Sequence, residues 1–230
     1  MTMPTFRTQL IAEFFGTATL LAIIVGSGFV VSQDGSEGIA ALFPHAVTIG
    51  VGLGVLIVLL RPVSGAQFNP AVTLCALALR LITVRHAVAY IVAQMAGAIV
   101  GVVATDRLMR SAAFAFATTE RTGVPLVVSE TGATTLLLVI IFVLVRRGEL
   151  HLLPSAVGGY ILAAILFTPS TAFANPAVTI ARIFTDSYTG IAATGVPGFV
   201  LAQLLAIPVA LGLIATFQPA TTPVTGDNKR

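Results

Sequence analysis

The sequence predicts an all-α membrane protein with six transmembrane helices and two half-spanning helices in an inverted repeat. Three observations predict this fold: the composition, six apolar runs of spanning length, and two copies of an Asn-Pro-Ala motif. Of the 230 residues, 57% are hydrophobic and 9% are charged, whereas a soluble domain carries about 25% charged residues. Six spans of about 20 residues occupy most of the chain. We therefore expect a single domain over residues 1–230, with no catalytic or nucleic-acid-binding domain beside it.

Six apolar runs are each near the length that a helix needs to cross a bilayer. Two shorter apolar stretches, beginning at Asn69 and Asn175, are too short to cross and predict half-spanning helices. The first long run has no small-residue cleavage site after it, so we expect it to stay as the first helix. The long runs cover residues 9–31, 39–60, 84–105, 126–145, 152–167 and 196–217.

The two halves of the chain repeat each other, at approximately residues 8–110 and 124–218. Within them, residues 64–73 (SGAQFNPAVT) match residues 170–179 (STAFANPAVT). Each repeat holds three spanning helices. Because three is an odd number, the second repeat must enter the bilayer from the opposite side, and the repeats are expected to be inverted.

Basic residues predict the orientation in the membrane. With the N-terminus inside, the cytoplasmic side carries eight basic residues and the outer side at most four, which follows the positive-inside rule. We therefore place both termini in the cytoplasm. The inner residues are Arg7, Arg61, Arg80, Arg85, Arg146, Arg147, Lys229 and Arg230; the outer ones are Arg107, Arg110 and Arg121, with Arg182 as a fourth candidate.

Each Asn-Pro-Ala motif predicts a helix start, because Asn is a strong N-cap and Pro suits the first helical position. A lone copy would indicate an ordinary capped helix. Two copies on inverted short elements predict half-helices that meet N-terminus to N-terminus near the midplane, around a cavity. Two positive dipole ends and two free amide donors there would select neutral hydroxylated solutes against cations. The copies are Asn69-Pro70-Ala71 and Asn175-Pro176-Ala177.

With residues 64–66 (SGA) and 12–17 (AEFFGT), these motifs make the sequence resemble the aquaporin and aquaglyceroporin family, the major intrinsic proteins. The resemblance covers nearly the whole chain. It implies one pore per subunit and a homotetramer in the lipid bilayer, with small-molecule permeants as partners. It implies neither a cofactor nor a nucleic-acid partner.

Glu13 and Glu130 are ionisable residues at equivalent places in two apolar runs, so they are candidate functional groups. An acid pair for catalysis is one interpretation, but no His or second carboxylate stands beside either in sequence. The resemblance instead implies that they bind backbone amides of the loops before the half-helices. We expect Gln94 and Gln203 to form interhelical hydrogen bonds. The three histidines lack ligand spacing, so no metal site is expected.

The resemblance also implies a constriction on the outer side of the pore, which spacing from the two asparagines places at Ile49, Ala163, Ala172 and Val178. Thr48 replaces Ile49 if that spacing slips by one residue. Relatives usually have arginine where Val178 stands, and an arginine supplies a fixed charge with five donors. The predicted filter is therefore wide, apolar and uncharged, and passes solutes larger than water.

Residues 173–182 (FANPAVTIAR) resemble a bacterial subgroup of aquaglyceroporin-like channels, some of which accompany arsenic-resistance genes and conduct arsenite. The resemblance implies the inner (plasma) membrane of a bacterium. Arsenous acid is a neutral trihydroxide of about the size of glycerol, which suits the predicted filter. Glycerol, water, urea and small organic acids stay open as cargo.

Arg182 follows Val178 by four residues, which places it one helical turn further outward. It has two interpretations. As an anchor it would bond loop carbonyls. As a displaced charge it would attract oxyanions to the outer vestibule without plugging the path.

Three functions are compatible with these sequence patterns. The leading hypothesis is a passive channel for small neutral solutes, and hence no enzyme. A secondary transporter of small organic acids or anions is the alternative, because inverted repeats and broken helices occur there too. A transporter that couples solute movement to an ion gradient normally needs ionisable groups at the midplane, and this chain has asparagine amides there. A closed, junction-forming tetramer would need bulky residues at the constriction.

Overall fold

A computed structural model describes residues 4–33, 35–109, 112 and 114–217. Outside them lie three charges used for the predicted orientation, Arg110, Lys229 and Arg230, and the predicted end of the second repeat at residue 218. The described elements are α1 (Phe6–Gln33), α2 (Gly38–Ser64), α3 (Pro70–Ala78), α4 (Val84–Leu108), α5 (Val124–Arg147), η1 (Leu150–Leu152), α6 (Leu153–Phe167), α7 (Pro176–Ala181), η2 (Arg182–Phe184) and α8 (Val196–Phe217).

Six helices in the described chain are long and apolar enough to cross a membrane: α1, α2, α4, α5, α6 together with η1, and α8. The predicted all-helical fold class is confirmed. The helices run slightly beyond the apolar runs at several ends. For example, α2 continues through Arg61 and ends at Ser64, and Gly65 follows as its left-handed cap with a φ of 92° that glycine allows.

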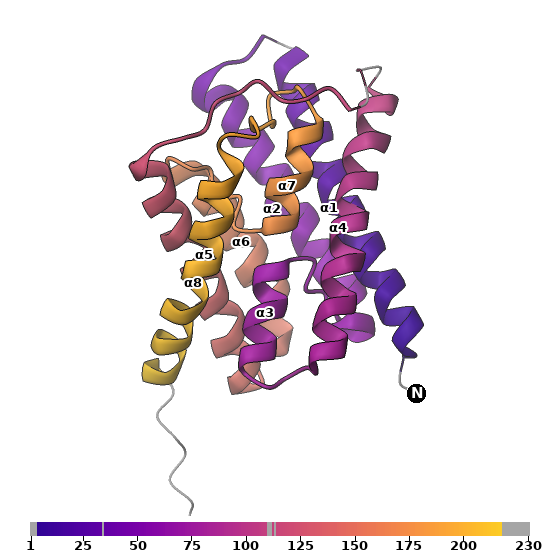
Figure 1. Cartoon of the computed structure of the whole chain (residues 1–230), viewed down its shortest axis with the longest axis vertical. Helices are drawn as coiled ribbons and strands as arrows, with labels where there is room; N and C mark the ends of the chain where they lie inside the picture. The colour runs from indigo at the N-terminus through magenta and orange to yellow at the C-terminus, as the bar shows by residue number, and fades with distance from the viewer. Residues whose placement is uncertain (1–3, 34, 110–111, 113, 218–230) are drawn as a thin grey trace, which may run out of the picture.

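The two short helices lie inside the bundle of long ones (Figure 1), α3 in its lower half and α7 in its upper half. Their N-terminal ends meet near mid-height, where Asn69 Nδ2 donates to the carbonyl of Ala174 at 2.7 Å. The start of α1 and the end of α8 lie at the same end of the bundle. The segment 114–123 crosses the opposite end.

Glycines let the long helices approach closely where α4 crosses α1. A Cβ at Gly97 would lie 2.3 Å from the carbonyl oxygen of Phe14, and one at Gly101 would lie 2.2 Å from that of Ala18. Membrane helices lack a hydrophobic driving force for association, and small residues at such crossings allow the close van der Waals packing that holds the helices together instead. This contact fixes α1, and with it Glu13, against the wall of the central cavity.

Gly101→Ala is expected to destabilise the protein, because its new methyl group would overlap a backbone carbonyl that has no room to move. The expected loss is about 1–3 kcal/mol, measured as a lower unfolding temperature in detergent. Gly132→Ala is the matched control, since nothing lies within 4 Å of a Cβ there. Equal unfolding temperatures for the two variants would contradict this account of the helix crossing.

Candidate functional site: a pore through the bundle

Both half-helices begin at an asparagine that caps its own helix. Asn69 has extended backbone angles (φ −153°, ψ 117°) and its Oδ1 accepts from the N–H of Ala71 at 2.8 Å. Asn175 repeats this geometry (φ −157°, ψ 113°) and accepts from Ala177 at 2.9 Å and Val178 at 3.3 Å. A proline follows each asparagine at the first helical position, where a missing N–H costs nothing.

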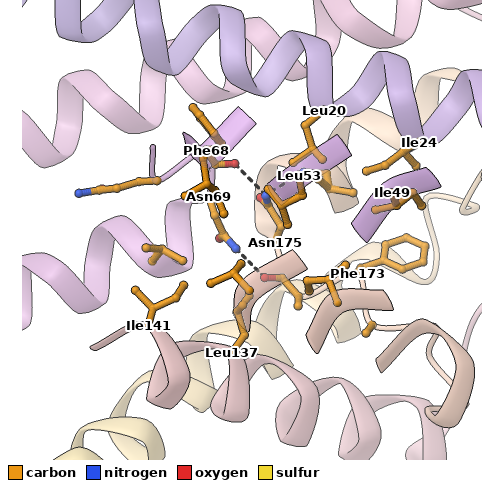
Figure 2. Close-up of a pocket in the computed structure, with 18 of the residues that line it drawn as sticks. Leu20, Ile24, Ile49, Leu53, Phe68, Asn69, Leu137, Ile141, Phe173 and Asn175 are labelled. Atoms are coloured by element: carbon orange, nitrogen blue, oxygen red, sulfur yellow. Dashed lines mark hydrogen bonds between the residues drawn. The ribbon is translucent and has the colours of Figure 1, made fainter. Parts of the chain in front are cut away.

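Each asparagine also bonds the loop that leads to the other half-helix (Figure 2). Asn69 Nδ2 donates to Ala174 O at 2.7 Å, and Asn175 Nδ2 donates to Phe68 O at 2.8 Å. The expectation that the amide groups are wholly free is therefore wrong. Because Nδ2 carries two N–H groups, one donor of each amide is left for a solute. Both side chains line the central cavity.

The loops before the asparagines have an unusual backbone. Ala66 and Phe68 in the first loop have φ of 53° and 50°, and Ala172 and Ala174 in the second have φ of 44° and 48°. A left-handed conformation costs a residue with a Cβ about 1–2 kcal/mol. The matching pattern in both loops therefore needs an external support.

Glu13 is that support for the first loop. Its Oε1 accepts from Ser64 Oγ at 2.6 Å and from the N–H of Gln67 at 3.0 Å. Its Oε2 accepts from the N–H of Phe68 at 2.7 Å and from Gln94 Nε2 at 2.8 Å. The side chain is fully buried and does not line the cavity. Its lone pairs are thus occupied by loop and helix donors, which leaves it no acid–base chemistry on a solute.

Glu130 supports the second loop through one of its two oxygens. Its Oε1 accepts from the N–H of Ala174 at 2.5 Å and from Gln203 Nε2 at 2.7 Å. Gln203 Nε2 also donates to Thr179 Oγ1 on α7 at 2.8 Å, as Gln94 Nε2 donates to Thr73 Oγ1 on α3 at 3.0 Å. The paired networks support the predicted repeat, although its boundaries stay a prediction.

The cavity has a volume of about 330 Å³ and extends through the bundle past both asparagines. Its walls are mostly apolar and come from the long helices α1, α2, α5 and α6, from the half-helices α3 and α7, and from the loops that precede the half-helices. Figure 2 shows these side chains around the Asn pair: Leu20, Ile24, Ile49, Leu53, Leu137 and Ile141.

Three of the four predicted filter residues line this cavity: Ile49, Ala172 and Val178. The fourth does not, because Ala163 is exposed on the outside of α6, which lines the cavity with Ile161 and Ile165 instead. Two residues along a helix turn the side chain through about 200°, so a two-residue error in spacing reverses the face.

The alternative residue Thr48 is also misplaced. It is exposed, and its Oγ1 donates to the carbonyl of Pro44 at 2.8 Å. Ile49, Ala172 and Val178 carry no charge, and the α6 isoleucines that line the cavity are larger than the predicted alanine. That these residues form the filter stays a prediction.

Arg182 lies at the mouth of the cavity that the charge count predicts to face outside, called the outer mouth below, and it combines features of both predicted roles. It is 6% exposed, its Nε donates to the carbonyl of Thr189, and its Cζ lies 3.6 Å from the centre of the Phe173 ring. The carbonyl bond is what an anchor requires. However, the side chain also lines the cavity, so its charge faces the solute path.

Three further polar residues line the outer mouth and were not among the predicted site residues: His45, Arg121 and Tyr188. Arg121 donates through Nε to Gly190 O at 3.0 Å and through Nη2 to Tyr188 O at 3.3 Å. His45 precedes Ile49 by four residues, so helical spacing could have found it one turn outward. Arg121 comes from a loop, where no periodicity marks it.

Residues 1–171 match the family model described as "Major intrinsic protein". The chain belongs to this family. It is 39% identical over 211 residues to aquaglyceroporin AqpS of Rhizobium meliloti (strain 1021), covering 91% of this chain and 90% of that protein. It is also 36% identical to aquaporin-2 of Rattus norvegicus over 96 residues, 42% of this chain and 34% of that protein.

A solved structure shows the same fold. The aquaglyceroporin from Plasmodium falciparum superposes with a TM-score of 0.67 at 19% identity, covering 94% of this chain and 98% of that chain. Major intrinsic proteins are membrane channels for water or glycerol. The chain is therefore a multi-pass membrane channel and not an enzyme.

Proposed function

We propose that the chain is a passive channel for small neutral solutes, namely water, glycerol-like polyols and arsenous acid, with an arginine-less filter. The observation that carries this proposal is the lining of the cavity between the asparagines and the mouth. Ile49, Ala172 and Val178 contribute no charge there, so a polyol would not have to pass a guanidinium at this level.

The cavity wall suits a polyol because it offers two kinds of contact. Apolar side chains can contact the carbon skeleton of the solute. The loops at residues 65–68 and 171–174 and the two asparagine amides also line the cavity and can offer hydrogen-bonding groups to its hydroxyls. Arsenous acid presents the same hydroxyls without charge.

Relatives support parts of this proposal. The similarity to aquaglyceroporin AqpS favours glycerol over a strictly water-selective channel and favours a bacterial plasma membrane. A homotetramer is supported by family membership. Cytoplasmic termini are supported by the charge count and by the common end of α1 and α8 (Figure 1).

Coupled transport is disfavoured by the position of the ionisable groups. Among the described lining residues, those that titrate lie at the outer mouth: His45, Arg121, Arg182 and Tyr188. At the Asn pair the lining consists of asparagine amides and loop residues that do not ionise. A transporter normally places its coupling groups near the midplane.

The test is osmotic swelling of proteoliposomes with water, glycerol and arsenous acid measured side by side. We expect glycerol flux well above that of empty liposomes, and no change when ionophores collapse the ion gradients. Flux that needs a gradient would favour the transporter. Absence of flux for all three solutes would favour the closed tetramer.

Asn175→Asp is expected to admit cations, because it places a carboxylate where two helix N-termini meet and where Phe68 O now accepts a hydrogen bond at 2.8 Å. Asn175→Ala loses the cap, at a cost of about 1 kcal/mol, and weakens discrimination without attracting cations. Proton leak into dye-loaded vesicles measures the difference. Unchanged proton conductance in Asn69→Asp and Asn175→Asp alike would refute this role.

A further inference from the structure

The outer mouth holds two guanidinium groups around one aromatic ring. Arg182 Cζ lies 3.6 Å and Arg121 Cζ 5.5 Å from the centre of the Phe173 ring. Both side chains line the cavity, as does Tyr188, whose ring His45 contacts edge-on at 5.6 Å. These groups lie one helical turn outward from the apolar level, because His45 precedes Ile49, and Arg182 follows Val178, by four residues.

Neither guanidinium has a carboxylate partner within the described residues. Three acidic side chains of this end accept hydrogen bonds from threonines: Asp106 from Thr185 Oγ1 at 2.9 Å, Asp186 from Thr118 Oγ1 at 3.0 Å, and Glu120 from Thr194 Oγ1 at 2.9 Å. A fourth, Glu37, is exposed at the start of α2. Arg182 is 6% exposed, and an arginine is almost never so deeply buried unless it is paired. Arg121 lies half-buried at the same mouth, and the two charges together favour an anion from outside the chain.

The hydrogen bonds that the arginines do make hold them in place for such a partner. Arg182 Nε donates to the carbonyl of Thr189. Arg121 donates through Nε to the carbonyl of Gly190 and through Nη2 to that of Tyr188. Each guanidinium has five N–H donors in a rigid fork. Donors on the Nη atoms thus stay available while the loop carbonyls and the Phe173 ring fix the orientation of the forks.

We propose that Arg121 and Arg182 form a binding site for a compact oxoanion at the outer mouth of the pore. The planar forks match the paired oxygens of a phosphonate or carboxylate, and such bonds are the strong, charge-assisted kind. The proposal rests on the proposed function, because the site lies on the same solute path. An anion bound there sits outside the apolar level and obstructs the approach of glycerol to it.

The test is glycerol flux in proteoliposomes that hold methylphosphonate at equal concentration on both sides, compared with chloride at equal ionic strength. We expect saturable inhibition by methylphosphonate that weakens at high salt. Arg121→Gln removes a charged hydrogen-bonding partner and should raise the half-inhibitory concentration by about tenfold or more. Arg107→Gln is the control, because Arg107 is an exposed outer arginine away from the cavity.

Two further measurements keep the test decisive. Arg121→Lys retains the charge without the fork and should bind with intermediate affinity, and it replaces Arg121→Gln if the latter does not fold. Calorimetric titration of methylphosphonate into the detergent-solubilised wild type should give heat of binding even if the channel conducts nothing. Two results would overturn the anion site alone. The first is normal glycerol flux with neither inhibition by methylphosphonate nor heat of binding. The second is equal inhibition in Arg121→Gln and Arg107→Gln. Binding heat without any glycerol flux would support the site and count against the proposed function.

Discussion

Val178→Arg is expected to reduce glycerol flux far more than water flux. Val178 is 3% exposed and lines the cavity with Ile49 and Ala172. An arginine side chain at this position would fill part of the solute path with a charged group that holds its own water. A rise of about 1.4 kcal/mol in the barrier for glycerol corresponds to a roughly tenfold lower rate. Stopped-flow light scattering on proteoliposomes measures both fluxes.

Val178→Leu separates the effect of volume from that of charge. It adds one methylene without adding a charge, so its glycerol flux should fall between those of the wild type and Val178→Arg. If Val178→Arg lowers water and glycerol flux by the same factor, or changes neither, then Val178 does not line the narrow part of the pore.

Glu13→Ala is expected to prevent assembly of the pore wall. It removes the acceptor of the buried Phe68 N–H and the part-buried Gln67 N–H, and of two side-chain donors, Ser64 and Gln94. Each buried donor left unsatisfied costs about 1–3 kcal/mol. The total is comparable to the about 5–15 kcal/mol that stabilises a typical folded protein.

The yield of monodisperse protein after detergent extraction measures this loss. Glu13→Gln retains one acceptor oxygen and should be less damaged. Glu37→Ala is the control, because Glu37 is exposed and makes no side-chain cap bond at the start of α2. If Glu13→Ala is extracted and unfolds like Glu37→Ala, the carboxylate does not hold the loop.

The helices and the Asn pair could be predicted because their signals are local. Apolar runs place the spans within a few residues of the observed ends, as for α8, where the run and the helix are both 196–217. Asn-Pro at a helix start depends on capping within one turn, so Asn69 and Asn175 could be identified as caps from sequence. Glu13 and Glu130 stood out because a charge within an apolar run needs a partner.

Positions that depend on the path of a loop could not be predicted in the same way. Ala163 was chosen by counting back from Asn175, and that count crosses the loop after Phe167, whose shape the sequence does not reveal. The structure lines the cavity with Ile161 and Ile165 instead. Arg121 belongs to a long connection, and its contacts with Tyr188 and Gly190 join residues 67 and 69 positions apart.

Glycerol flux and proton leak, measured in the same proteoliposomes, test whether the pore passes neutral solutes and excludes cations. A neutral solute passes the apolar level and the Asn pair, while two helix N-termini repel cations there. We expect rapid glycerol flux, with a proton leak under a pH gradient equal to that of empty liposomes. Proton leak that rises with the amount of reconstituted protein, or glycerol flux no faster than in empty liposomes, would contradict it.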